Sequence, residues 1–172
     1  MDLSLEDKIS ALYLCADILE YPDDNFYNNI ENIEKLTYQK YLSQEIALED
    51  ICSEYIWLFS INATKLKCVP YASWWIDGRM FGKTLTRIMD FYNRCGYKFD
   101  AEFLKKPADN ISSMITFIAI LAEEGRFDDI KEFARFLSWT DDFANSLDKA
   151  TDIKIFQQAV NLSSQILTDL TL

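Results

Sequence analysis

The side chains able to do chemistry in this 172-residue chain are carboxylates, cysteines and aromatic rings, because histidine is absent. Without histidine the chain lacks the usual general base and the commonest metal ligand, which excludes triad hydrolysis and histidine-based metal chemistry. The four cysteines form no CxxC pair and have no spacing typical of a zinc site. We therefore expect small core cysteines in a reducing compartment, and predict no metal, no cofactor and no catalytic residue. Catalysis by carboxylates alone stays open, although no motif marks it.

Aromatic side chains are concentrated between Glu54 and Asp77, in the stretch EYIWLFSINATKLKCVPYASWWID. It holds three of the four tryptophans, at positions Trp57, Trp74 and Trp75. That is a large apolar surface for a connector. Adjacent bulky residues in a connector cannot easily both face inward. We therefore expect one of the two neighbouring tryptophans to be partly exposed.

The charge balance is strongly acidic, with 28 acidic against 17 basic residues, a net charge of −11 and a pI near 4.4. Such a field repels phosphate backbones and anionic lipid, so nucleic acid is not an expected ligand. It attracts basic peptides, although solubility alone accounts for it equally well. No apolar run approaches ~18 residues and the N-terminus lacks the features of a secretory signal. We expect a cytoplasmic protein without a membrane span.

Apolar residues recur at helical spacing through most of the chain, and only four glycines and three prolines interrupt it. The sequence therefore predicts an all-α, single-domain helical bundle over residues 1–172. The segment 111–122 is apolar around most of its circumference, which is typical of a central helix ending at Gly125. Two long connectors are expected at 60–77 and 97–107. The predicted helices begin near Ser4, Asp23, Glu45, Phe81, Asp109, Phe127, Thr140 and Asp152.

Two sequence pieces stand at a characteristic separation: EYIWLF followed by VPYASWWID, and CGYKF followed by KPADNISSMITFIAILAEEG. Together they resemble the TorD/DmsD/NarJ family of redox-enzyme maturation chaperones over about residues 50 to 125. The family pattern has an acidic-aromatic-x-x-Leu-Phe helix end, a proline and serine in the loop behind it, and a Pro-x-Asp-His motif opening a central helix. Asn110 stands where the family has histidine. Asparagine cannot titrate near neutral pH, so protonation-linked behaviour is not expected here.

The resemblance implies a TorD-like, non-enzymatic cytoplasmic chaperone for a molybdopterin-dependent oxidoreductase. It would bind the twin-arginine signal peptide and the apo-enzyme before cofactor insertion and export. Carried over by position, together with two neighbours whose chemistry suits an arginine-bearing peptide, the expected peptide-binding residues are Tyr55, Leu58, Phe59, Pro70, Tyr71, Trp74, Trp75, Asp77, Asp109 and Asn110. In this hypothesis the exposed residues are Tyr71 and Trp75, and Phe59 forms the floor of a groove.

Structural explanations compete with these functional ones. The spacing of Tyr55, Leu58 and Phe59 is that of any buried helix face, so plain core packing accounts for it. Asp109 follows Pro107 at a helix start, where an N-cap carboxylate needs no ligand and contributes about 1 kcal/mol. Capping and peptide binding are compatible, and both roles stay open.

Other functions also stay open at this point. A NarJ-like assembly factor, or a helical scaffold, would bind the enzyme body independently of a signal peptide. A small carboxylate enzyme has only unlocalised acids in its favour. No Gly-x-x-x-x-Gly-Lys-Ser/Thr loop is present, so no nucleotide site is predicted. The two long connectors leave a homodimer formed by helix exchange open.

Overall fold

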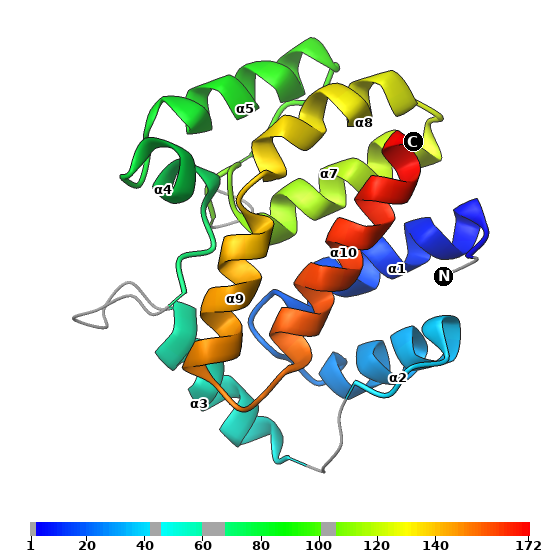
Figure 1. Cartoon of the computed structure of the whole chain (residues 1–172), viewed down its shortest axis with the longest axis vertical. Helices are drawn as coiled ribbons and strands as arrows, with labels where there is room; N and C mark the ends of the chain where they lie inside the picture. Colours follow the sequence, from blue (N-terminus) through cyan, green and yellow to red (C-terminus); the bar gives the residue numbers. More distant parts are fainter. Residues whose placement is uncertain (1–2, 42–45, 60–67, 101–105) are drawn as a thin grey trace.

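The computed structural model describes residues 3–41, 46–59, 68–100 and 106–172, and within them the chain is built from helices (Figure 1). The prediction of an all-α bundle is confirmed, whereas its treatment as a single domain over residues 1–172 stays a prediction. The helices are α1 (Leu5–Ile18), α2 (Phe26–Thr37), α3 (Leu48–Phe59), α4 (Ala72–Asp77), α5 (Lys83–Arg94), α7 (Ile111–Glu123), α8 (Phe127–Phe133), the 3-10 helix η1 (Ala134–Leu137), α9 (Thr140–Ala150) and α10 (Ile155–Thr171).

Helix α7 is the centre of the bundle, as its apolar sequence predicted. Almost all of its side chains are buried, and it packs most extensively against α1. Helix α1 in turn contacts α2 and α10, while α8 packs against α7 and α10. In Figure 1 the helices α1, α7 and α10 run through the middle, with α5 and α8 at one end and α2 and α3 at the other. A helix apolar on most sides is stable only when neighbours cover it in this way.

Several helix ends follow from local sequence. The hydroxyl of Ser4 accepts a hydrogen bond from the amide of Asp7 at 3.1 Å, so the predicted N-cap of α1 is confirmed. Gly96 and Gly125 adopt left-handed φ angles of 90° and 69° after α5 and α7, as expected of glycine caps. These ends depend only on residues within one turn, which is why the sequence predicts them.

Three predicted boundaries are wrong. The segment 60–77 was expected to be a connector, yet its last residues form helix α4. The central helix begins at Ile111 rather than Asp109, because Asn110 is its N-cap and accepts a hydrogen bond from the amide of Ser112 at 3.0 Å. Phe81 precedes α5, with a φ of 56° and 63% of its surface exposed. Residues 60–67 of the first connector, residues 101–105 of the second and the expected helix start at Glu45 lie outside the described residues.

The cysteines are free thiols, and Cys15, Cys68 and Cys95 are buried while Cys52 is partly so. Burial raises the pKa of the Cys15 thiol to about 12, so it stays protonated in the core. Among the described helices none is long and apolar enough to cross a membrane.

Candidate peptide-binding site

The two motif segments meet in space as a single antiparallel bridge between Tyr71 and Asn110. The carbonyl of Pro70 accepts from the amide of Ile111 at 2.9 Å, and the amide of Ala72 donates to the carbonyl of Asp109, also at 2.9 Å. Backbone pairing therefore fixes the start of α4 against the start of α7. Of the predicted site residues, this junction brings Pro70, Tyr71, Asp109 and Asn110 together.

Asp109 lies beneath this junction and is only 1% exposed. Its Oδ2 accepts from the amide of Ser73 at 2.9 Å, in the first turn of α4. Asp109 therefore does cap a helix, as the sequence predicted. The helix is α4, however, and not the helix that follows Asp109 in the chain. Burial, together with the negative charge of Asp109, raises the pKa of Tyr92, whose hydroxyl donates to the carbonyl of Ala108 at 3.2 Å. In this conformation the Asp109 carboxylate is buried and holds the first turn of α4, so it does not face solvent.

Tyr71 is half-buried and lies between the two motifs. Burial raises its pKa, a hydrogen bond with the Asn110 side chain partly opposes this, and the charge of Asp109 adds to it. Burial also raises the pKa of Tyr55 to about 12, with a smaller contribution from Tyr71. The hydroxyl groups of Tyr55 and Tyr71 and the amide of Asn110 therefore lie close enough to interact. We call these three side chains the tyrosine–asparagine surface.

The predicted residues of α3 belong mainly to the core. Leu58 is fully buried and Phe59 is 8% exposed, packed against Phe156 with ring centroids 5.5 Å apart. Tyr55 is half-buried, and its ring lies 4.7 Å from that of Phe59. Of these three predicted residues only Tyr55 has surface to offer a ligand, while Leu58 and Phe59 support the ring behind it.

The two neighbouring tryptophans divide as the sequence predicted, with one partly exposed, although the exposed one is Trp74 rather than Trp75. Trp74 is 41% exposed. Trp75 stacks on Trp139 with centroids 6.1 Å apart and planes at 13°, and its indole nitrogen donates to the carbonyl of Val69 at 2.7 Å. A six-residue helix turns successive side chains by about 100°, so one faces the bundle and the next faces solvent.

Asp77 caps the next helix. Its two carboxylate oxygens accept from the amide and the hydroxyl of Thr84, at 2.7 and 2.9 Å, in the first turn of α5. The carboxylate is exposed, so a ligand can reach it, but its hydrogen bonds already hold α4 against α5. The acids expected to meet a cationic peptide, Asp77 and Asp109, are therefore both occupied by helix caps.

Exposed carboxylates that the sequence reasoning missed lie on the other side of Tyr55. The ring of Tyr21, 55% exposed, meets Tyr55 edge-on at 5.6 Å. Tyr21 also borders an open cavity of about 310 Å³, which we call the acidic cavity; its lining residues are Asp17, Glu20, Tyr21, Pro22, Asp23, Asn25, Phe26 and Asn29. Burial, and then the charge of Asp23, raise the pKa of Asp17. The acids around Tyr21-Pro22 were visible in the sequence but indicated only a helix boundary.

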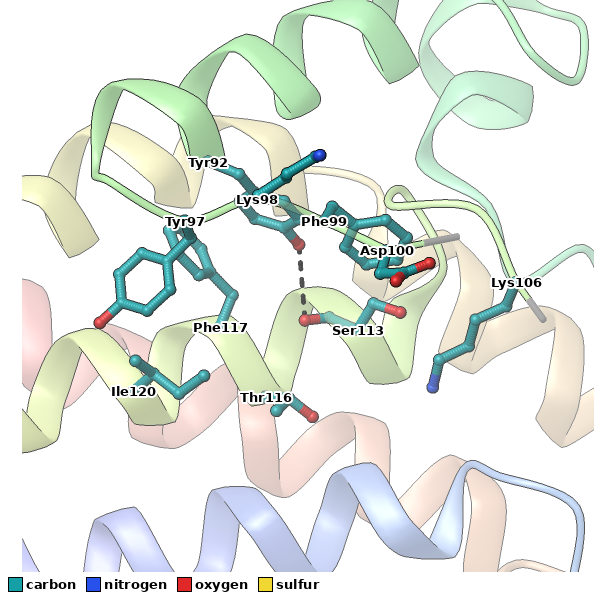
Figure 2. Close-up of a pocket in the computed structure, with 10 residues that line it drawn as sticks. All are labelled: Tyr92, Tyr97, Lys98, Phe99, Asp100, Lys106, Ser113, Thr116, Phe117 and Ile120. Carbon is teal, nitrogen blue, oxygen red and sulfur yellow. Dashed lines mark hydrogen bonds between the residues drawn. The ribbon is translucent and has the colours of Figure 1, made fainter. Parts of the chain in front are cut away.

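A second cavity, of about 270 Å³, lies beside α7 (Figure 2). Its walls are largely apolar: Tyr97 and Phe99 come from the segment after α5, and Phe117 and Ile120 from α7. Lys106 lies at its edge, ion-paired with Glu20, and its ammonium group donates to the Ser112 hydroxyl at 2.9 Å. Burial outweighs the charge of Asp17 and lowers the pKa of Lys106 to about 8. We call this space the aromatic cavity.

A polar network joins the two cavities to the motif junction. The Ser112 hydroxyl lies 2.6 Å from both Glu20 Oε1 and Asn110 Oδ1, and its single proton goes to one of them. Glu20 lines the acidic cavity and Lys106 the aromatic cavity, so both connect through Ser112 to Asn110. Across the described ranges, no group of three His, Cys, Asp or Glu side chains could hold a metal ion. The arrangement is suited to binding a peptide that carries both cationic and apolar groups.

Comparison with known proteins gives the family. Residues 24–150 match the family described as nitrate reductase delta subunit. A crystal structure of a candidate redox enzyme maturation protein from Archaeoglobus fulgidus superimposes with a TM-score of 0.72 over 93% of each chain at 22% identity, which shows a shared fold. None of the curated proteins compared with the chain matches it. The chain belongs to the nitrate reductase delta subunit family of NarJ/TorD-type chaperones, which serve redox enzyme maturation.

Proposed function

We propose that this chaperone acts in the cytoplasm, binds the twin-arginine signal peptide of a molybdopterin-dependent oxidoreductase, and holds the apo-enzyme until cofactor insertion and export. The observation that carries the proposal is the junction of Tyr71 with Asn110. Tyr55 beside this junction contacts Tyr21 of the acidic cavity, and Asn110 contacts Ser112, which binds Lys106 at the aromatic cavity. The protein's own role is binding rather than catalysis.

The two kinds of surface match the two parts of such a peptide. Guanidinium groups of the basic region would enter the acidic cavity, where Asp17 and Asp23 are exposed, and stack on Tyr21. One such stacking contact contributes about 0.5–2 kcal/mol. The apolar region that follows would lie over Tyr71 toward Trp74, with the aromatic cavity open to a large apolar side chain. Asn110 itself does not titrate, so pH dependence of binding near neutrality would come from Lys106, whose pKa of about 8 lies in the same network.

A second candidate function is an assembly factor that grips the folded body of its enzyme and ignores the signal peptide. Two observations favour it: the family description names a nitrate reductase subunit, and Leu58, Phe59 and Asp109 offer a peptide almost no surface in this conformation. Capture of the client enzyme from its native host, with and without its leader, separates the candidates. Loss of capture without the leader supports signal-peptide binding, and unchanged capture supports the assembly factor.

Calorimetric titration with a twin-arginine leader, its Arg-to-Ala version and a scrambled version tests the first candidate. We expect the intact leader to bind at least about tenfold more tightly than the Arg-to-Ala peptide, because charge-assisted pairs and ring stacking are lost together. Added salt should weaken binding, since exposed ion pairs are screened. Equal affinity for all three peptides would contradict the proposal.

Helix exchange between two copies stays part of the proposal for the protein's assembly. The segments that would have to open, within 60–77 and 97–107, lie partly outside the described residues. Light scattering with a mass readout across a concentration series tests it: exchange requires a mass of twice 20.1 kDa, and a constant 20.1 kDa contradicts it.

A further inference from the structure

Positively charged side chains gather where α5 meets η1, outside the two cavities of the proposed peptide site. An open cavity of about 220 Å³ is lined there by Arg87, Asp90, Phe91, Arg94, Arg135 and Phe136. The chain contains only five arginines and carries a net charge of −11, so three arginines around one small cavity stand out. In Figure 1 this part of the molecule lies toward the opposite end from α2 and α3. We call it the arginine pocket.

Aromatic rings hold the guanidinium groups of the arginine pocket in place. Arg87 and Arg135 both lie over the ring of Phe136, at 5.5 and 5.1 Å from its centroid. Arg94 lies over Phe91 at 4.3 Å. Both rings are 3% exposed, so they form a fixed floor beneath the guanidinium groups. A guanidinium that is positioned before a ligand arrives loses less entropy on binding.

The carboxylates near the arginine pocket do not balance the charge of all three arginines. Glu132 pairs with both Arg94, at 2.7 Å, and Arg135, at 3.2 Å. Arg87 makes no ion pair with any carboxylate in the part of the chain that the structure describes. Asp90 lines the pocket and makes no ion pair with a described residue. The charge of Asp129 also reaches Arg94, but Asp129 is itself paired with Arg126, so Glu132 and Asp90 leave one of the three guanidinium charges unbalanced. Arg87 and Arg135, brought together around one ring, therefore lack a shared anion.

We propose that the arginine pocket binds a carboxylate from an acidic segment of a partner protein. One excess positive charge matches a carboxylate better than a phosphate dianion, which Asp90 would repel, and the guanidinium of Arg87 is free to pair with both carboxylate oxygens. That the anion belongs to a protein segment rests on the proposed chaperone function. The overall charge of −11 repels acidic partners, but beyond about 8 Å that repulsion is screened at physiological salt, so short-range contacts decide binding.

The test is fluorescence anisotropy of the full chain with a labelled, glutamate-rich helical peptide and its Glu-to-Gln counterpart. The variants are Arg87→Gln and Asp90→Asn, with Lys149→Gln and Asp142→Asn on α9 as controls of equal charge change. We expect the Glu-to-Gln peptide and the Arg87→Gln protein each to bind about tenfold more weakly, because a bidentate charged pair is lost. Asp90→Asn should bind more tightly, and each control should stay within about twofold of wild type.

Three outcomes overturn the proposal: no difference between the two peptides, the same loss for Arg87→Gln as for Lys149→Gln, or displacement of the peptide by inorganic phosphate beyond that caused by chloride of equal ionic strength. The last would make the pocket a site for a free oxyanion. Binding of the twin-arginine leader, measured on the same proteins, separates this inference from the proposed function. If the protein binds the acidic peptide but not the leader, the inference about the arginine pocket is supported and only the signal-peptide proposal is contradicted.

Discussion

Two neighbouring tryptophans, Trp74 and Trp75, have different roles in this protein. Trp75 stacks on Trp139 and donates a hydrogen bond, while Trp74 faces outward with 41% of its surface exposed. Their places follow from the short helix that carries them, since a change of one position rotates a side chain from the bundle toward solvent.

This difference predicts opposite effects of two alanine substitutions. Trp75→Ala should lower the free energy of unfolding by about 2–4 kcal/mol, because it removes a stacked ring and leaves a cavity. Trp74→Ala should change it by less than about 0.5 kcal/mol, as is usual at the surface, but should weaken binding of the leader peptide. Urea unfolding followed by tryptophan fluorescence, with calorimetry for binding, checks both. Similar destabilisation by the two substitutions would contradict the assignment.

For single residues, the sequence predicts what a side chain does better than it predicts which other residue the side chain contacts. It predicts that one of the two tryptophans is exposed, and that Asp109 caps a helix. It cannot identify which tryptophan, because Trp139 lies far along the chain. Nor can it identify the capped helix, because the amide that Asp109 accepts from is 36 residues away. Both outcomes depend on tertiary contacts that local periodicity does not contain.

Helix α4 is the element that sequence patterns miss. Six residues are too few to show helical periodicity, and isolated helices this short are unstable in water. Its two ends are held by side chains and backbone groups from elsewhere: Asp109 binds its first turn, and Asp77 at its last turn caps α5. The longer helices α1, α5 and α7 carry their own periodicity, and α1 and α7 also carry their own N-caps, which is why the sequence predicts them.

The junction of α4 with α5 requires a glycine at position 82. A Cβ added to Gly82 would lie 2.2 Å from Asp77 Oδ2, so the carboxylate that caps α5 could not keep its place. Gly82→Ala and Asp77→Ala should each lower the free energy of unfolding by about 1–2 kcal/mol, the usual effect of losing a helix cap.

A double-mutant cycle of these two substitutions measures their coupling. Since each removes the same cap, the double variant should be destabilised by clearly less than the two single effects added together. Urea unfolding of the wild type, both single variants and the double variant provides the cycle. Strict additivity would show that Gly82 acts independently of the Asp77 cap.

For the molecule as a whole, burial of ionisable side chains predicts loss of stability in alkali. The pKa values of Cys15 and Tyr55 are both raised to about 12, from ordinary values of 9.0 and 10.0. The native state therefore holds these protons more tightly than the unfolded state does. Their contribution to stability is complete below about pH 9 and is lost as the pH rises toward 12.

Removing the hydroxyl group of Tyr55 tests that account. Tyr55→Phe should make the fall in the free energy of unfolding between pH 10 and 12 shallower, by on the order of 2 kcal/mol, since each pKa unit corresponds to about 1.4 kcal/mol. Tyr38→Phe is the control, because Tyr38 is 95% exposed, and its profile should follow the wild type. Urea unfolding across pH under reducing conditions gives the curves. A Tyr55→Phe profile parallel to the wild type would contradict the expected linkage.

The whole molecule also separates two surfaces of opposite charge. Around Tyr55 and Tyr71 lie the acidic cavity and the aromatic cavity, suited to a basic and apolar leader, while the arginine pocket at α5 is suited to an acidic segment. The sequence singles out the two motif segments that carry Tyr55, Tyr71 and Asn110. It does not single out the acidic cavity beside them, because Asp17 and Asp23 indicate only a helix boundary there. It does not predict the second, whose arginines come from helices far apart in the chain.

The central claim is that arginines of a leader peptide occupy the acidic cavity beside Tyr21. A calorimetric double-mutant cycle tests it most directly, pairing the wild type and an Asp17→Asn/Asp23→Asn variant with the leader and its Arg-to-Gln version. Asp141→Asn/Asp142→Asn on α9 is the control of equal charge change. We predict a coupling free energy of about 1 kcal/mol or more for the cavity variant and close to zero for the control. Equal coupling for the two variants, or none for either, would contradict the account.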